Sequence, residues 1–179
     1  MYKIKDRVLL GTLAGFTGDI VKTVIDEISH KKKLSQRSFR ETAAGVWVKK
    51  GSEAKSIKGQ ALGGLLDLGM SMAGGIGTVY LLTKTGRDHL ITKGIIAGIG
   101  LGSLLDFAIS SLPQNKIKPT DATSHLSYMA SHAAYGLVTT VMVAKLGHPS
   151  LFDKQPDNDY LEPTELTTEE QIQEERIYS

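Results

Sequence analysis

The chain has 179 residues, enough for one ordinary domain, and its 21 basic and 19 acidic residues leave a formal net charge of +2. It contains no cysteine, which excludes a disulfide scaffold, a thiolate metal site and a cysteine nucleophile. The mean hydropathy of −0.09 is typical of a soluble protein, but apolar and polar residues are strongly segregated along the chain.

Four apolar stretches alternate with polar connectors. They cover residues 8–28, 59–82, 89–112 and 125–146. Each has about 20 residues, the length that an α-helix needs to cross ~30 Å of hydrocarbon. Alternating strand patterns are almost absent. The sequence therefore predicts an all-α integral membrane helical bundle of three or four spans within residues 1–148, followed by an acidic tail at residues 149–179.

The four stretches differ in quality as membrane spans. Residues 89–112 are the best, because Asp106 is the one charge in their second half. Residues 8–28 are the weakest, because they carry Asp19, Lys22, Asp26 and Glu27. This first stretch either spans the bilayer, which gives four spans, or lies in the interface as an amphipathic helix, which gives three.

Two segments carry opposite charge. Residues 29–58 hold nine bases and two acids, whereas residues 151–179 hold nine acids and two bases. Short loops rich in Lys and Arg stay cytoplasmic, so we expect the basic loop at 29–58 inside the cell and the acidic tail outside. The bases at Lys3, Lys5 and Arg7 also favour the cytoplasm, which conflicts with this orientation if the first stretch spans.

The basic loop is a candidate lipid or partner surface. Its candidate contacts are Lys31, Lys32, Lys33, Arg37, Arg40 and Trp47. Their charge would attract anionic lipid, and Phe39, Val46 and Trp47 suit insertion at the level of the headgroups. A short interfacial helix is expected from Ser35 onward. Contact with nucleic acid phosphates is the less favoured alternative for these bases.

Glycines inside the apolar stretches repeat at intervals of four residues. Those with this spacing are Gly11, Gly15, Gly59, Gly63, Gly94, Gly98 and Gly102. Small residues so spaced let two membrane helices approach closely, whereas in water each glycine would weaken a helix by about 1 kcal/mol. We therefore predict tight helix packing at these positions. The glycines near position 100 lack the GxGxxG spacing and the strand context of a dinucleotide site.

Ionisable residues inside the apolar stretches form a candidate intramembrane polar site, which includes Asp19, Lys22, Asp67 and Asp106. Such a group at membrane depth costs about 2.5–3.5 kcal/mol, so it faces protein or water and has a partner. We expect Asp67 and Asp106 toward the cytoplasmic half, facing each other or sharing Lys22 or a histidine. They serve either as a proton or cation site or as hydrogen-bonding groups that lock helices together.

The fourth stretch carries a polar face. His125, Tyr128, His132 and Tyr135 lie at i, i+3, i+7 and i+10, which places them on one side of a helix. We expect this face toward protein or a water-filled crevice, with hydrogen bonds between helices. The two histidines are about 10 Å apart along the helix axis, too far to share a metal. Neither a metal nor a cofactor is expected.

Residues 11–22 (GTLAGFTGDIVK) and the glycine-rich hairpin that follows resemble the small uncharacterised multi-pass membrane proteins of endospore-forming bacteria. The resemblance implies a bacterial cell membrane and carries no known activity.

The leading functional hypothesis is a non-enzymatic membrane component that is structural or binds a partner, including a second copy of itself. The alternative is a small transporter or channel subunit, in which the intramembrane Asp, His and Tyr groups line a path. A third hypothesis is a soluble helical bundle with glycine-rich helices, which would not need detergent for solubility.

Overall fold

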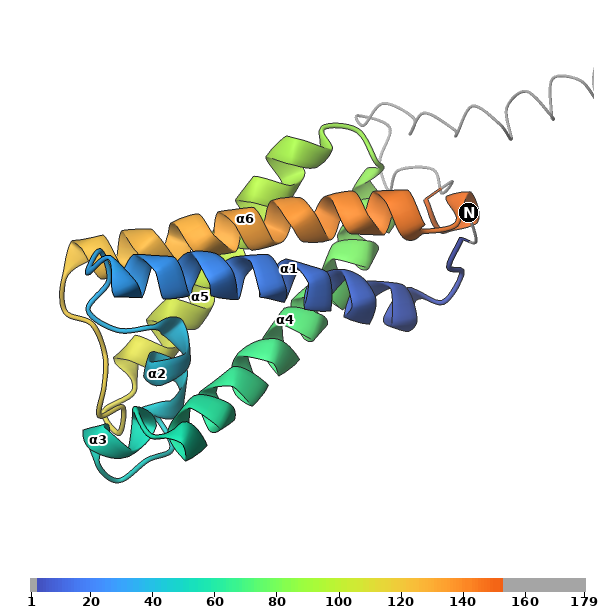
Figure 1. The fold of residues 1–179 in the computed structure, drawn as a ribbon. Helices are drawn as coiled ribbons and strands as arrows, with labels where there is room; N and C mark the ends of the chain where they lie inside the picture. Colours follow the sequence, from blue (N-terminus) through green and yellow to red (C-terminus); the bar gives the residue numbers. More distant parts are fainter. Residues whose placement is uncertain (1–2, 153–179) are drawn as a thin grey trace, which may run out of the picture.

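The computed structural model describes residues 3–152 and contains six α-helices in that range (Figure 1). They are α1 (Arg7–Lys31), α2 (Phe39–Ala44), α3 (Gly51–Ala54), α4 (Ile57–Thr85), α5 (Leu90–Ser111) and α6 (Ala122–Leu146), followed by a 3-10 turn at Pro149–Leu151. Within the described range, the one β-type pairing is an isolated bridge between Ile4 and Gly147. The predicted all-α fold is confirmed.

Side-chain caps fix where the long helices begin. The carboxylate of Asp6 accepts a hydrogen bond from the backbone N–H of Leu9 at 2.7 Å, and Asp121 accepts one from Ser124 at 2.9 Å. Ser56 caps α4 in the same way. Such caps satisfy N–H groups that have no partner within the first turn of a helix. At the other end of α4, Gly86 turns the chain with a φ of 81°, which glycine adopts without steric cost.

The four long helices run back and forth between two ends of the molecule. In Figure 1, α1 and α6 lie side by side in opposite directions, while α4 and α5 cross them obliquely. The bridge between Ile4 and Gly147 ties the start of α1 to the end of α6. At the opposite end, Asn115 donates hydrogen bonds to the carbonyl oxygens of Thr42 and Ile109. We call this second end the basic end, because residues 29–58 lie there.

Not every pair of long helices that follow each other in sequence is packed together. The closest pairs are α5 with α6, α1 with α4, and α1 with α6, whereas α4 and α5 diverge after their short connecting turn. The helix α6 therefore lies in the interior, and α4 and α5 are held apart on its two sides. This divergence opens the groove described below.

Three helices, α1, α4 and α5, are long and apolar enough to cross a membrane, as judged by length and composition over the described residues. The first stretch, expected to be the weakest span, is among them, and α6, which contains the fourth stretch, is not. The helix α6 carries more polar side chains, and those of Ser124, Ser131 and Thr139 are fully buried against protein.

The seven glycines with four-residue spacing all lie at close approaches between segments. A Cβ added at any of them would come closer than 3.0 Å to another part of the chain. Gly11 and Gly15 face α4, Gly59 and Gly63 face α3 and α2, and Gly94, Gly98 and Gly102 face α6. Six further glycines among the described residues meet the same criterion and lie outside the repeats that we identified: Gly18, Gly45, Gly74, Gly75, Gly136 and Gly147.

Two details differ from the sequence-based expectations. Phe39, expected at the headgroup level, is 2% exposed, because α2 folds under the bundle and packs against α4. The bundle also extends past residue 148, since Leu151 and Phe152 are buried in an apolar core with Leu10 and Val143. The rest of the acidic tail lies outside the described residues.

Candidate functional site

A buried ionic cluster joins α1 to α4. The ammonium group of Lys22 forms ion pairs with Asp67 and with Asp19, the latter at 2.9 Å, and donates a hydrogen bond to Ser71 Oγ at 2.9 Å. Ser71 Oγ in turn donates to Asp19 at 2.7 Å. The side chains of Lys22 and Asp67 are 3% and 4% exposed. All three N–H donors of this lysine are therefore satisfied inside the bundle.

Aromatic residues surround this ionic cluster. The Lys22 ammonium lies 5.6 Å from the ring centroid of Phe39 and 5.8 Å from that of Tyr135. These distances allow cation–π attraction, which is strongest for a desolvated cation. The Tyr135 hydroxyl donates a hydrogen bond to the Ser71 carbonyl oxygen at 2.6 Å, which connects α6 to the same cluster.

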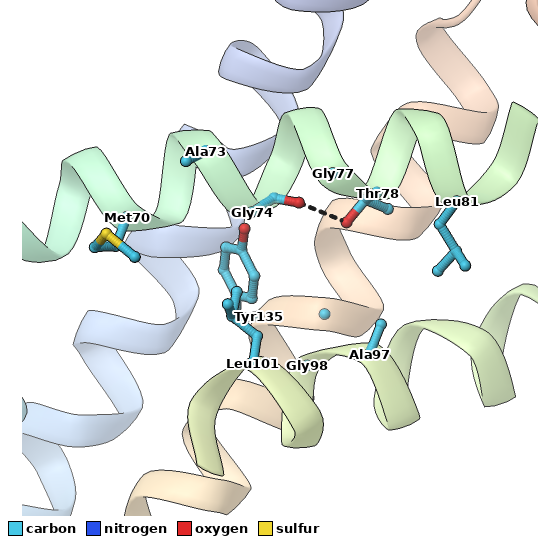
Figure 2. A pocket seen from close by; sticks show the side chains of 11 residues that line it. Met70, Ala73, Gly74, Gly77, Thr78, Leu81, Ala97, Gly98, Leu101 and Tyr135 are labelled. Atoms are coloured by element: carbon cyan, nitrogen blue, oxygen red, sulfur yellow. Dashed lines mark hydrogen bonds between the residues drawn. The ribbon is translucent and has the colours of Figure 1, made fainter. Parts of the chain in front are cut away.

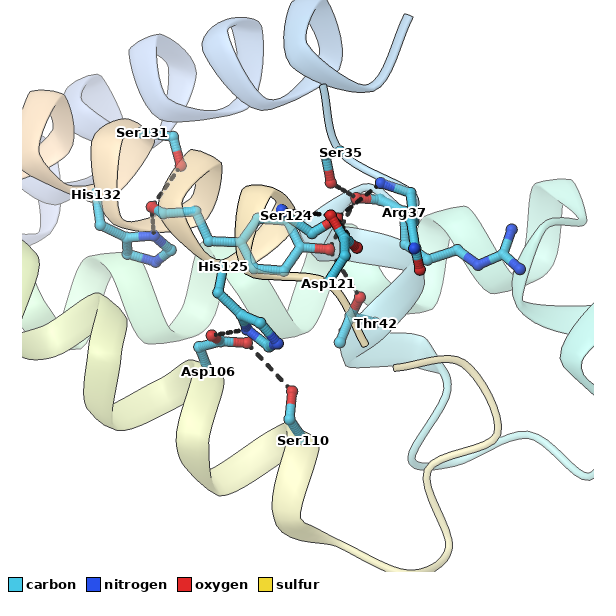
Figure 3. A network of polar contacts seen from close by, with 12 residues as sticks. Ser35, Arg37, Thr42, Asp106, Ser110, Asp121, Ser124, His125, Ser131 and His132 are labelled. Carbon is cyan, nitrogen blue, oxygen red and sulfur yellow. Dashed lines mark hydrogen bonds and ion pairs between the residues drawn. The ribbon is translucent and has the colours of Figure 1, made fainter. Parts of the chain in front are cut away.

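Asp106 lies in a separate contact near the basic end. Its carboxylate is 2.5 Å from Nδ1 of His125 and accepts a weaker hydrogen bond from Ser110 at 3.2 Å (Figure 3). The Asp106 side chain is 7% exposed and that of His125 is 31% exposed. Asp67 and Asp106 are thus both in the half of the bundle toward the basic end, but they do not share a partner. Asp67 pairs with Lys22, and Asp106 pairs with a histidine.

The polar face of α6 points into the bundle. Tyr128, His132 and Tyr135 are at most 2% exposed, whereas His125 is half-buried. The Tyr128 hydroxyl donates to the Arg37 carbonyl oxygen at 2.7 Å and lies 3.1 Å from Thr42 Oγ1, which fixes the segment before α2 to α6 (Figure 3).

His132 is buried and is held by a hydrogen bond and a ring contact. Its Nδ1 donates to the Tyr128 carbonyl oxygen at 2.8 Å, and its ring packs edge-on against Phe39 at 4.9 Å. Over residues 3–152, no three His, Cys, Asp or Glu side chains are grouped so that they could hold a metal ion. The two histidines of α6 therefore have different partners: His125 contacts Asp106, and His132 contacts Tyr128 and Phe39.

The residues of the basic surface are not equivalent. Lys31, Lys32 and Lys33 are exposed, and so is Trp47 at 69%. Arg40 is partly buried and pairs with Glu27 at 3.0 Å, so part of its charge is used within the fold. Arg37 is partly buried as well.

Two carboxylates at helix ends have lowered pKa values. The hydrogen bond from Lys93, at 2.5 Å, lowers the pKa of Asp88 in the turn between α4 and α5. The hydrogen bond from the Ser124 side chain, at 2.7 Å, lowers the pKa of Asp121 at the start of α6. Both carboxylates are therefore held in the charged form by donors that fold around them.

An apolar groove of about 400 Å³ lies between α4 and α5. Figure 2 shows the two helices on either side of it, with Tyr135 of α6 between them. Its walls include Met70, Ala73, Gly74, Gly77, Ala97 and Leu101. Polar atoms at the groove are already paired, since Thr78 donates to the Gly74 carbonyl oxygen at 2.9 Å. The groove therefore presents an apolar concave surface, and its polar groups are engaged in hydrogen bonds within the bundle.

Sequence reasoning missed three parts of this arrangement. Ser71 completes the donors and acceptors around Lys22, and its position four residues after Asp67 placed it on the same helix face. Phe39 lies beside the ionic cluster although its segment of the chain, with Arg37 and Arg40, is basic. The groove depends on the divergence of α4 and α5, for which no local sequence signal exists.

Comparison with known proteins gives no relative: no protein-family model, no curated protein and no solved structure matches the chain.

Proposed function

We propose that this protein is a non-enzymatic, multi-pass membrane component whose bundle binds a partner from within the bilayer. The observation that carries the proposal is the open apolar groove between α4 and α5. Ligand sites are typically concave and mostly apolar, with volumes of about 300–1,000 Å³, and this groove falls within that range. Exposed Met70, Ala73 and Gly77 leave it accessible from outside the molecule.

Exposed apolar side chains support a bilayer as the surroundings of the bundle. Large apolar residues at least 38% exposed lie along all three span-like helices and include Phe16, Ile20 and Val24 on α1, Leu65 and Tyr80 on α4, and Ile96, Leu104 and Phe107 on α5. The interior helix α6 has one such residue, Leu126. A soluble monomer rarely exposes so many large apolar side chains along three of its helices.

The proposed orientation places the basic end in the cytoplasm. That end carries the nine bases of residues 29–58 together with Lys116 and Lys118. The start of α1 and the end of α6 lie at the opposite end, so Lys3, Lys5 and Arg7 would face outside. The larger basic segment decides the orientation in this proposal.

Single-cysteine labelling in intact cells tests the placement, because the chain has no native cysteine. Ser52 on α3 and Thr85 at the end of α4 are exposed at opposite ends. A membrane-impermeant thiol reagent should label Thr85→Cys in intact cells and Ser52→Cys only after lysis. The reverse pattern would overturn the orientation. Release of the wild-type chain by alkaline carbonate would instead favour the soluble bundle.

Partner binding is tested by a photo-crosslinking amino acid at Ala73, which lines the groove. Its matched control is the same substitution at Gly100, whose surroundings are open for 4 Å. We expect adducts, with lipid or protein, from position 73 in excess of those from position 100. Equal yields from both positions would contradict a binding role for the groove.

A small transporter or channel subunit is the second candidate, favoured by the Lys22–Asp67 ion pair at membrane depth. Asp67→Asn and Asp106→Asn should then abolish ion or solute flux in vesicles while the helical content stays unchanged. The proposed binding role predicts no flux from the wild-type protein.

A further inference from the structure

The groove between α4 and α5 continues toward the basic end. A second apolar cavity of about 220 Å³ shares Met70 with the first and is lined by Leu66 and Asp67 of α4, Leu105 and Ile109 of α5, and Phe39 and Trp47. From Leu66 to Leu81, the two parts follow α4 for about 22 Å at 1.5 Å per residue. This length exceeds the roughly 15 Å depth of the hydrocarbon in one leaflet.

The mouth of this extended groove is cationic and aromatic. Trp47, 69% exposed, lines it, and the exposed Lys49 and Lys50 follow directly in the chain. A third lysine comes from the segment after α5. Lys118 is exposed and donates a hydrogen bond to the carbonyl oxygen of Ser110 at 3.1 Å. Ser110 directly follows Ile109, which lines the groove. The acids nearest in sequence are Glu53, three residues after Lys50, and Asp121, three residues after Lys118. Asp67 of the lining is paired with Lys22, so the lysines still outnumber the free carboxylates around the mouth.

Apolar length and a cationic mouth together match one kind of membrane molecule. We infer that the extended groove binds an anionic phospholipid, with one acyl chain along α4 and its phosphate beside Lys49, Lys50 and Lys118. Lysines close to the cytoplasmic surface attract anionic lipids, and tryptophan prefers the headgroup level. A partner helix would use the apolar walls but would have no use for the lysines. This inference rests on the proposed membrane placement and names the partner of the same groove.

Trp47 provides the probe, because it is the only tryptophan in the chain and it lines the groove mouth. The full chain is reconstituted in phosphatidylcholine vesicles that contain a minor fraction of phosphatidylglycerol. Bromine atoms, which quench tryptophan, are placed on the acyl chains of either lipid at equal mole fraction. We expect brominated phosphatidylglycerol to quench about fivefold more effectively, because several lysines act together on one headgroup. Equal quenching by the two lipids would overturn the inference.

Two variants separate the groove from general surface attraction. Lys49→Gln combined with Lys118→Gln should reduce the lipid preference toward one. Gly77→Leu should fill the groove without a clash, because no atom lies within 4 Å of an added Cβ, and should reduce quenching by phosphatidylglycerol at least about twofold. Gly100→Leu is the matched control, with equally open surroundings outside the groove.

The outcomes distinguish failure of this inference from failure of the proposed function. If Gly77→Leu behaves as Gly100→Leu does, the lipid is not in the groove and the inference is wrong, although the membrane placement stands. If the amino acid at position 73 crosslinks to protein alone, the groove binds a protein helix and not a lipid. The inference is then wrong, but the proposed binding role of the groove stands. If brominated lipids of neither kind quench Trp47 and carbonate releases the chain, the proposed function fails as well.

Discussion

Gly15 of α1 and Gly75 of α4 pack backbone against backbone: a Cβ added to Gly75 would lie 2.8 Å from the Cα of Gly15. No side chain separates the two helices at this point. In the proposed membrane placement, close backbone packing would be a main source of helix association, because lipid chains are as apolar as leucine. The α1–α4 pair therefore depends on these positions, and the ionic cluster lies farther along the same interface.

Gly75→Ala should destabilise the bundle, by about 1–3 kcal/mol, because an extra methyl group would overpack the α1–α4 contact. Gly77→Ala, two residues along the same helix, is the control, since its added Cβ meets no atom within 4 Å. That control should be neutral or slightly stabilising, because alanine favours helix more than glycine does. Denaturant unfolding in detergent, followed by circular dichroism, measures both. Equal losses in the two variants would contradict the packing argument.

The spacing of glycines was a good guide to packing because it is a local pattern. Close approach requires small residues on one helix face, and a repeat of four residues places them there whatever the partner is. Gly75 and Gly136 were missed because neither has another glycine four residues away in its own helix. Each nevertheless contacts a glycine of another helix.

A local sequence pattern could not predict which charged residues pair with each other. Asp67 and Asp106 lie on consecutive helices, and sequence alone left open whether they share a site. Because α4 packs on α1 and α5 packs on α6, the two aspartates receive different partners, Lys22 and His125. The choice of helix partners is a property of the whole bundle. Phe39 illustrates the same limit, since its burial depends on how α2 folds beneath α4.

Lys22→Met should lower stability strongly, by about 3–5 kcal/mol, because it leaves the Asp67 carboxylate buried without its counter-charge. Asp67→Asn should cost less, since Lys22 keeps its ion pair with Asp19 at 2.9 Å. The double variant Lys22→Met/Asp67→Asn should be more stable than Lys22→Met alone, because the unpaired carboxylate is gone. Unfolding free energies of the three variants in one detergent test this order. Strict additivity of the two single changes would show that the pair is not coupled.

Tyr128→Phe should loosen the segment that joins α1 to α2. The substitution removes the hydroxyl that donates to the Arg37 carbonyl oxygen at 2.7 Å, and a lost hydrogen bond of this kind costs about 0.5–1.5 kcal/mol. Trypsin should then cleave at Lys31–Lys33 faster than in the wild type. Tyr80→Phe is the control, because Tyr80 is 49% exposed on α4. Unchanged cleavage in Tyr128→Phe would mean that other contacts hold the segment.

The turn between α4 and α5 should contribute stability that depends on pH. The hydrogen bond from Lys93 lowers the pKa of Asp88 from its ordinary value of 3.8, so the charged carboxylate stabilises the folded state. This contribution is present above the ordinary pKa and is lost as pH falls through the lowered value in the folded protein. The Asp88 side chain is 55% exposed, so the effect should be below about 1 kcal/mol.

Asp88→Asn tests this dependence directly. The variant should be slightly less stable than the wild type at pH 7, and the difference should shrink below the ordinary pKa of the aspartate and vanish below its lowered pKa in the folded protein. Lys93→Met should cost more at pH 7, because Lys93 also donates to the Thr85 carbonyl oxygen at 2.7 Å and to that of Gly86 at 3.2 Å. These two bonds do not depend on the Asp88 charge, so the Lys93→Met deficit should persist in acid. Parallel pH profiles for the two variants would show that the ion pair, rather than the cap on α4, carries the whole effect.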